Sequence, residues 1–276
     1  PDMTRSVDEF HLDSDYLDSS GTAVTVAWQI AQEAGLDIPQ IFKVRLEGNS
    51  EFYGLYTFLE EDDKSWREEF GYENMSYHGT DKVKTNIVAD PVNEFQQWKA
   101  ALVVPRGSAR RDYAIDNSDI PNMINYMAFM ALIHNCEWHN GKNMIKVHDV
   151  LGTNRWKILA HDIDCTMGSA GNIDRQISPF DEPFGGYDVE GRFQFSALYE
   201  ERDFREAYYR RLRTLSDEYY ASDRYLDMIQ DLYSRVEADA LLDVQKWPRY
   251  GRSPQQSLDN IRLQYYKTKK DLLVRY

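Results

Sequence analysis

The chain has 276 residues, of which 42% are hydrophobic and 13% aromatic, a composition that excludes a disordered chain and allows a sizeable buried core. A formal net charge of −14 argues against a general role in binding nucleic acid or anionic lipid, and no apolar run is long enough to span a membrane. Because the sequence opens at Pro1 without a signal-like segment, we expect it to be part of a longer protein.

Capping, apolar and turn residues predict a mixed first half. The expected elements up to residue 118 are a helix over 20–36 that stops near Gly35, strands over 40–48 and 51–61, a short helix over 60–71, a weak strand and loop over 74–90, a helix over 91–101 and a loop over 105–118.

The second half is predicted to be mainly helical, apart from one hairpin. The expected elements are a helix over 118–135 capped by Ser118 or Asp119, strands over 144–149 and 155–162, a Gly/Pro-bearing loop over 169–191, helices over 195–247 and a final helix over 254–276. This order predicts an α+β fold: a small mixed α/β part at about 1–105, and a catalytic hairpin with a largely helical lobe at about 106–276.

The stretch RWKILAHDIDCTMG (155–168) carries the strongest chemical signal, a strand that ends in Asp-x-Asp-x-Thr. In phosphatases of the haloacid dehalogenase type, such a strand supplies a nucleophile and a proton shuttle, here Asp162 and Asp164. That motif normally opens a doubly wound sheet. Here about 160 residues precede it, and no later strand carries a second acidic pair. The pattern also fits a metal-holding loop or a polar turn.

The order of features before this stretch favours the metal-holding loop. A helix leads to a loop with Glu137 and then Asn143, and a hairpin follows and ends at Asp162. Protein kinases place an acceptor-orienting carboxylate, a metal-binding Asn and a metal-binding Asp in this order. Phosphoryl transfer requires chiefly metal ligands and a positioned acceptor, so this order favours a kinase.

Three segments resemble the spore-coat protein H (CotH) kinase family of bacteria. LEGNSEFYGLYTFLEEDDKSWREEFGYENMSYHG is similar to its N-G-x-Y-x-G-L-Y-x-x-x-E region. NCEWHNGKNMIKVHD resembles its N-x-D...K/H-N-x-x-L-Y region, and RWKILAHDIDCTMGSAGN resembles its W-x-x-x-x-W-D-x-D-x-x-x-G region. The resemblance runs from about residue 10 to residue 250.

The resemblance implies roles for individual residues. Asp162, Asp164 and Asn143 become metal ligands, Asp162 is also catalytic, and Glu137 takes the place of the acceptor-orienting Asp. Glu60 corresponds to the glutamate after the Gly-Leu-Tyr strand and would structure the nucleotide pocket.

The sequence departs from the family pattern at several places. Glu137 stands where Asp is expected, and His161 replaces a Trp. SYHG stands where the family tends to show Tyr-Lys, which leaves Lys82 and Lys84 as substitutes for the nucleotide-binding lysine.

The resemblance further implies one divergent protein-kinase-like domain over residues 1–276. Its members use ATP and a divalent cation, Mg²⁺ or Mn²⁺, to phosphorylate hydroxyl groups of protein substrates. Many are secreted or attached to the cell or spore surface, so the family suggests an extracellular location. A catalytically inactive module for surface-protein binding is the alternative, favoured by Glu137 and the short start, and the phosphatase is the third possibility.

The two cysteines suggest one further hypothesis. Cys136 precedes Glu137, and Cys165 follows Asp164. If the two loops converge at the site, these thiols lie close enough to form a disulfide in an oxidising compartment. The alternative is two unrelated buried cysteines.

Overall fold

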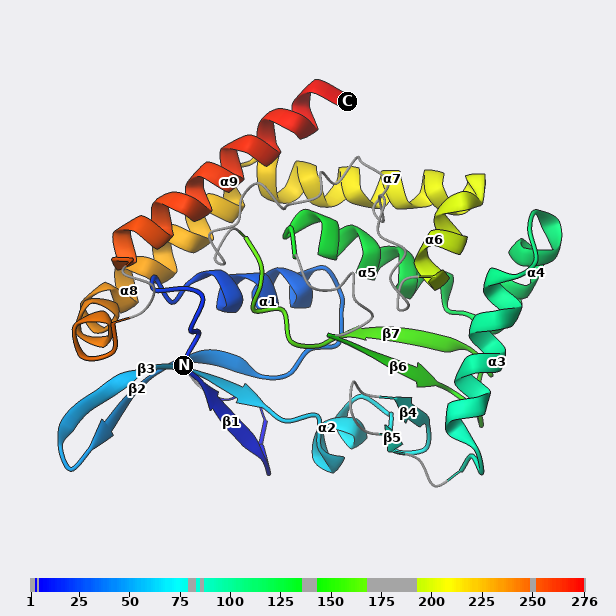
Figure 1. The fold of residues 1–276 in the computed structure, drawn as a ribbon, viewed down its shortest axis with the longest axis horizontal. Coiled ribbons are helices and arrows are strands. Elements are labelled where there is room, and N and C mark those ends of the chain that lie inside the picture. The colour runs from blue at the N-terminus through cyan, green and yellow to red at the C-terminus, as the bar shows by residue number, and fades with distance from the viewer. Residues whose placement is uncertain are drawn as a thin grey trace.

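The computed structural model describes residue 3 and residues 5–78, 83–84, 87–135, 143–167, 193–248 and 252–275. Within these ranges the protein mixes helices and strands, which confirms the predicted α+β class (Figure 1). The elements in chain order are β1 (Phe10–Asp13), α1 (Ala23–Glu33), β2 (Ile41–Gly48), β3 (Glu51–Glu60), α2 (Lys64–Glu69), β4 (Ser76–His78), β5 (Val83–Lys84), α3 (Pro91–Val103), α4 (Ser108–Asn117), α5 (Ile120–Leu132), β6 (Met144–His148), β7 (Trp156–Ala160), α6 (Phe193–Glu200), α7 (Arg202–Ser216), the π-helical turn η3 (Asp217–Ala221), α8 (Arg224–Lys246) and α9 (Pro254–Arg275).

The described strands form two antiparallel sheets. The first has the order β1-β3-β2, and the second has the order β5-β4-β6-β7. Strand β4 pairs with β6, so the second sheet joins the early part of the chain to the predicted hairpin. Both strands of that hairpin are confirmed, as are the strands predicted over 40–48 and 51–61.

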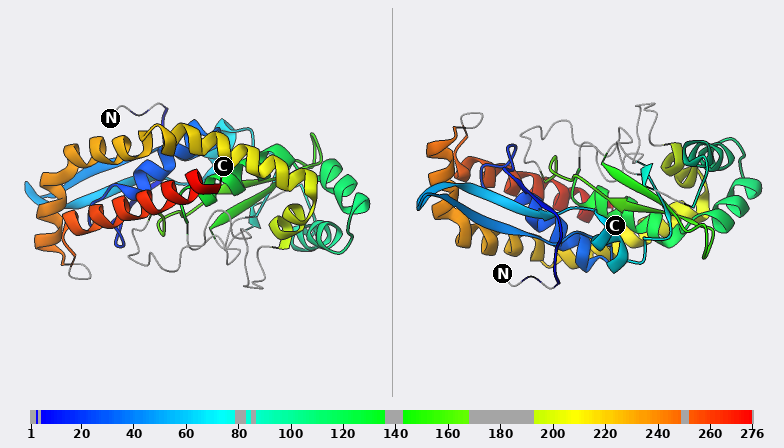
Figure 2. Two further views of the ribbon diagram at one scale, coloured as in Figure 1. Left: turned by 90° about the horizontal axis from the view of Figure 1, so that it is seen from above. Right: turned by 90° about the horizontal axis from the view of Figure 1, so that it is seen from below.

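Helices cover one side of both sheets. Helix α5 lies between α7 and β7, and α8 packs on β3 (Figure 1). Seen from above, α9 runs beside α8 (Figure 2). No helix in the described ranges is long and apolar enough to cross a membrane.

Helix α5 is the centre of the hydrophobic core. Its residues Met123, Tyr126, Ala128, Phe129 and Met130 are completely buried. Burial of one large apolar side chain contributes about 1.5–3 kcal/mol, so this helix cannot shift without a large loss of stability. Residues 120–132 therefore form a rigid helix that sets the positions of the elements packed against it.

One loop prediction is wrong. Residues 105–118 were expected to form a loop, but Ser108–Asn117 form helix α4. Its buried Arg110 donates hydrogen bonds to the carbonyl oxygens of Pro105, Val103 and Ala197. Ala197 lies 87 residues further along the chain, so a polar sequence with little helical periodicity gives no sign of this contact. Strand β1, which the pattern also did not predict, depends likewise on pairing with β3.

A buried carboxylate holds the start of α1. Asp18 Oδ2 accepts hydrogen bonds from the backbone N–H groups of Thr22 and Ala23 at 2.7 and 2.8 Å, and Oδ1 accepts from the N–H and hydroxyl of Ser20. The N-cap residue Thr22 makes no side-chain cap. The acid four residues upstream thus satisfies N–H groups that a helix start leaves unpaired.

Replacing this carboxylate should destabilise the fold. We expect Asp18→Ala to lower the free energy of unfolding by about 2–4 kcal/mol, because several buried donors lose a charged acceptor. Urea denaturation measures the loss, and Asp18→Asn should lose less because it keeps one acceptor. A change below about 0.5 kcal/mol in Asp18→Ala would contradict this role.

Candidate functional site

The β6–β7 hairpin brings two chain segments to one end. Met144 at the start of β6 is the pairing partner of Ala160 at the end of β7. Asn143, the residue before Met144, therefore lies beside the segment that begins at His161. Figure 1 shows these ends of β6 and β7 converging. The hairpin predicted from sequence thus places Asn143 and the Asp162–Asp164 segment at the same sheet end.

Apolar side chains bury both faces of the hairpin. Ile145, Val147 and Leu159 pack with Trp66 and Tyr72 on one side. On the other side, a second set belongs to the main core: Met144, Trp156, Ile158 and Ala160. Packing on both faces holds the open end of the hairpin in a defined position.

Helix α5 is tied to both ends of the segment that contains β7. At its start, the N–H of Asp119 donates to Trp156 O at 2.8 Å, and Asn122 Oδ1 accepts from Ile158 N at 2.8 Å. At its end, Ile133 O accepts from the N–H of Met167 at 2.9 Å and from the hydroxyl of Thr166 at 2.7 Å. We call this set of bonds the α5 clamp.

Four residues near the open end of the hairpin adopt left-handed backbone conformations. They are His134, Asn143, Asp162 and Met167, with φ angles of 50°, 57°, 46° and 54°. Asn and Asp tolerate this region, whereas His and Met rarely adopt it. Such conformations persist where surrounding structure imposes them, and they concentrate at functional sites.

The acidic segment alternates between anchored and accessible residues. Ile163 and Cys165 are buried, while Asp162 is exposed and Asp164 is half-buried. Asn143 is 5% exposed. The buried residues fix the backbone, and Asp162 faces solvent where a cation can reach it.

The donor set fits a hard divalent cation. Carboxylate and amide oxygens are ligands for Mg²⁺ or Mn²⁺, and Asp162, Asp164 and Asn143 supply both types. In the described part of the chain no three His, Cys, Asp or Glu side chains converge as a complete metal site. Mg²⁺ usually takes one or two carboxylates together with substrate phosphates and water, so such a partial site is compatible with a metal–nucleotide complex.

The remaining predicted residues have different placements. Glu60, at the end of β3, is 2% exposed, and its carboxylate accepts from the Arg5 guanidinium and, at 2.8 Å, from Gln40 N. Lys84 ends β5, but its side chain is not among the described parts, and Glu137 and Lys82 lie outside the described residues.

A polar network that the sequence analysis missed lies on the buried face of the second sheet. His148 Nδ1 is 2.6 Å from Glu94 Oε1, and His78 Nε2 is 3.8 Å from the other oxygen of the same carboxylate. The His148 ring stacks on Trp156 with 4.7 Å between centroids. Lys146 lies opposite His78 in the sheet register.

Lys146 is a buried cation on β6, the strand that follows Asn143. Its ammonium donates to Met144 O at 3.2 Å, which directs it toward the hairpin end that carries Asn143. Burial lowers the pKa of Lys146 to about 8. The signal for it in the sequence is a lysine within MIKVH, a strand whose other positions are buried on both faces.

The structure describes one of the two cysteines in the disulfide hypothesis. Cys165 is disulfide-bonded and 7% exposed. The sequence contains one other cysteine, Cys136, which lies outside the described residues. A covalent link at Cys165 restrains the acidic segment in addition to the α5 clamp.

His134, at the end of α5, should make the stability of this region depend on pH. Burial, with a smaller effect from the charge of Lys267, lowers the pKa of His134 to about 4. The unfolded chain binds this proton near pH 6.5, so folding stability is lost as the pH falls from 6.5 toward 4.

Asn tolerates the left-handed backbone of residue 134. We expect the free energy of unfolding of His134→Asn to fall less than that of the wild type between pH 6.5 and pH 4.5. The difference should be about 2 kcal/mol, because Asn has no proton to bind. Urea denaturation at the two pH values measures it. Equal losses in the two proteins would show that folding does not lower the pKa of His134.

A comparison with known proteins identifies the family of the chain. The family model described as CotH kinase protein matches residues 2–273 of the 276 residues. No curated protein matches the chain. The family match covers nearly the whole sequence and confirms the resemblance drawn from the three quoted segments. The chain therefore belongs to the CotH kinase family.

Proposed function

We propose that the protein transfers the γ-phosphoryl group of ATP to a hydroxyl group of a protein substrate, with Mg²⁺ or Mn²⁺ as cofactor. One observation carries the proposal: the hairpin and the α5 clamp hold Asn143 and the Asp162–Asp164 segment at one sheet end. Membership of the CotH kinase family supports the same reaction class.

In this proposal, Asp162, Asp164 and Asn143 hold the cation. The bound metal supplies charge stabilisation for the phosphoryl oxygens. Asp162 is exposed for this contact, while buried Ile163 holds the backbone on which it stands. Glu137 orients the acceptor hydroxyl.

The nucleotide-binding residues are also part of the proposal. Lys82 and Lys84 bind the nucleotide phosphates. Glu60 acts indirectly: its bonds to Arg5 and Gln40 order the end of β3 and so shape the nucleotide pocket.

We further propose that residues 1–276 form one divergent kinase-like domain, with an N-terminal α/β part over about 1–105 and a hairpin and helical lobe over about 106–276. The β4–β6 pairing supports this organisation, because one sheet receives strands from both parts. A secreted or surface location is favoured by the disulfide at Cys165, since disulfides persist in oxidising compartments.

The strand pairing argues against the phosphatase alternative. A nucleophile strand of that type belongs to a parallel, doubly wound sheet. In the described residues β7 pairs only with β6, in the antiparallel sense, apart from an isolated bridge between Ser118 and Trp156.

Incubation with γ-labelled ATP, Mn²⁺ or Mg²⁺ and a generic protein acceptor tests the proposed reaction. We expect label transfer that falls by roughly 100-fold or more in Asp162→Ala, because a metal ligand is lost. Asp112→Ala is the matched control: it removes an exposed acid from α4 and should leave transfer unchanged.

Two results would contradict parts of this proposal. Label transfer that survives Asp162→Ala would remove Asp162 from the metal site. Thermal stabilisation by ATP and metal without any transfer would favour the catalytically inactive binding module.

A further inference from the structure

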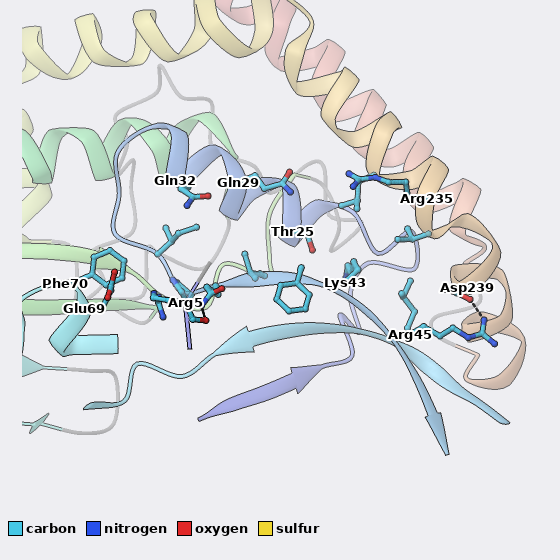
Figure 3. A pocket seen from close by; sticks show the side chains of 18 residues that line it. Arg5, Thr25, Gln29, Gln32, Lys43, Arg45, Glu69, Phe70, Arg235 and Asp239 are labelled. Carbon is cyan, nitrogen blue, oxygen red and sulfur yellow. Dashed lines mark hydrogen bonds and ion pairs between the residues drawn. The ribbon is translucent and has the colours of Figure 1, made fainter. Parts of the chain in front are cut away.

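A groove of about 780 Å³ lies between α1, β2 and α8, apart from the α5 clamp. Figure 3 shows it running along β2, from Arg5 and Phe70 at one end to Arg45 and Arg235 at the other. Its floor includes every residue from Ile38 to Lys43. A cavity that follows consecutive residues of one strand has the shape of an extended chain.

Strand β2 is an edge of its sheet among the described strands. The N–H of Glu60 donates to Gln40 O, so hydrogen-bonded pairs with β3 fall at even-numbered residues of β2. The backbone N–H and C=O groups of Ile41 and Arg45 therefore point away from β3. These groups are a template on which an added strand can pair.

Helix α1 forms one wall of the groove with a polar face. Thr25, Gln29 and Gln32 have the spacing that places them on one side of a helix. The Thr25 side chain is 1% exposed, and its hydroxyl has no hydrogen-bond partner among the described residues. Figure 3 shows this hydroxyl pointing toward β2. A buried, unpartnered hydroxyl at a groove is a place where a ligand atom can complete the hydrogen bonding.

The charge of the groove differs from that of the chain. The whole chain has 46 acidic and 32 basic residues, whereas the residues that line the groove include two acids, Glu69 and Asp239. The basic residues that line it are Arg5, Lys43, Arg45 and Arg235. Arg5 and Lys43 are neutralised by the buried acids Glu60 and Asp15, so the cations that an anionic ligand can engage here are Arg45 and Arg235.

Two of these basic residues can turn to a ligand. Arg235 is 61% exposed and pairs with Asp231 one turn earlier, and Arg45 is 42% exposed and pairs with Glu47 and Asp239. Exposed pairs of this kind contribute little, so exchanging the partner costs little. Lys43 is different, because its pair with Asp15 is buried and structural.

We propose that the groove binds an extended acidic peptide segment of a partner protein, which pairs with the outer edge of β2 as an additional strand. The backbone groups of β2 supply affinity, and Arg45 and Arg235 select acidic side chains. This site does not depend on the proposed phosphoryl transfer.

Peptides of about eight residues, the length of β2, provide the test. One pool alternates Asp or Glu with Val, Leu, Phe or Tyr, and a second pool has Lys or Arg in place of the acids. We expect the acidic pool to bind in fluorescence titrations at least roughly tenfold more tightly than the basic pool. Backbone N-methylation at one of the two alternating sets of positions in the acidic peptides should abolish binding, because every second N–H of the added strand faces β2.

A matched pair of variants localises the binding. Arg235→Glu should weaken it roughly tenfold, whereas Arg202→Glu, which breaks a similar exposed pair on α7, should leave it unchanged. Absence of binding by the acidic pool, equal binding of both pools, or binding insensitive to N-methylation or to Arg235→Glu would overturn the proposal. Retained label transfer from ATP in Arg235→Glu would show that the two sites are independent.

Discussion

The position of the candidate site depends on the α5 clamp. Helix α5 is buried over most of its length, and its two ends bond to the start of β7 and to the segment after it. A rigid helix that holds both ends of residues 156–167 fixes the length and direction of that segment. The buried neighbours of Asp162 in this segment thus hold its backbone in place while its side chain is exposed. A rigid core positions a loop site in this way.

The same constraint accounts for the unusual backbone near the hairpin end. His134 and Met167 are held in left-handed conformations that neither residue favours, and both flank bonds to Ile133 O. The strain is offset by the buried side chains around it. A disulfide at Cys165 adds a covalent restraint to the same segment. Lys146 and His78, with Glu94 of α3 beside His78, lie on the sheet that carries this end.

Sequence reasoning succeeded where the signal is local. Helix α5 has strong apolar periodicity, and its cap is Asp119, one of the two predicted candidates. The β6–β7 hairpin has apolar strands joined by clear turn residues. It failed where a distant partner decides the structure, as in α4, which depends on carbonyl groups around Arg110. The predicted pairing of the two hairpin strands also placed Asn143 beside the acidic segment correctly. The neighbours of Lys146 come from α3 and β4, and no spacing in the sequence shows them.

The central claim is that the hairpin end and the acidic segment form one metal site. Cleavage by bound Fe²⁺ tests it most directly, because iron in place of Mg²⁺ cuts the backbone only close to the metal when ascorbate and peroxide are added. With ATP present, we expect cuts confined to residues near Asn143 and within 160–165, suppressed by excess Mg²⁺ and absent in Asp162→Ala. Cuts elsewhere in the chain, or cuts that persist in Asp162→Ala, would contradict the account.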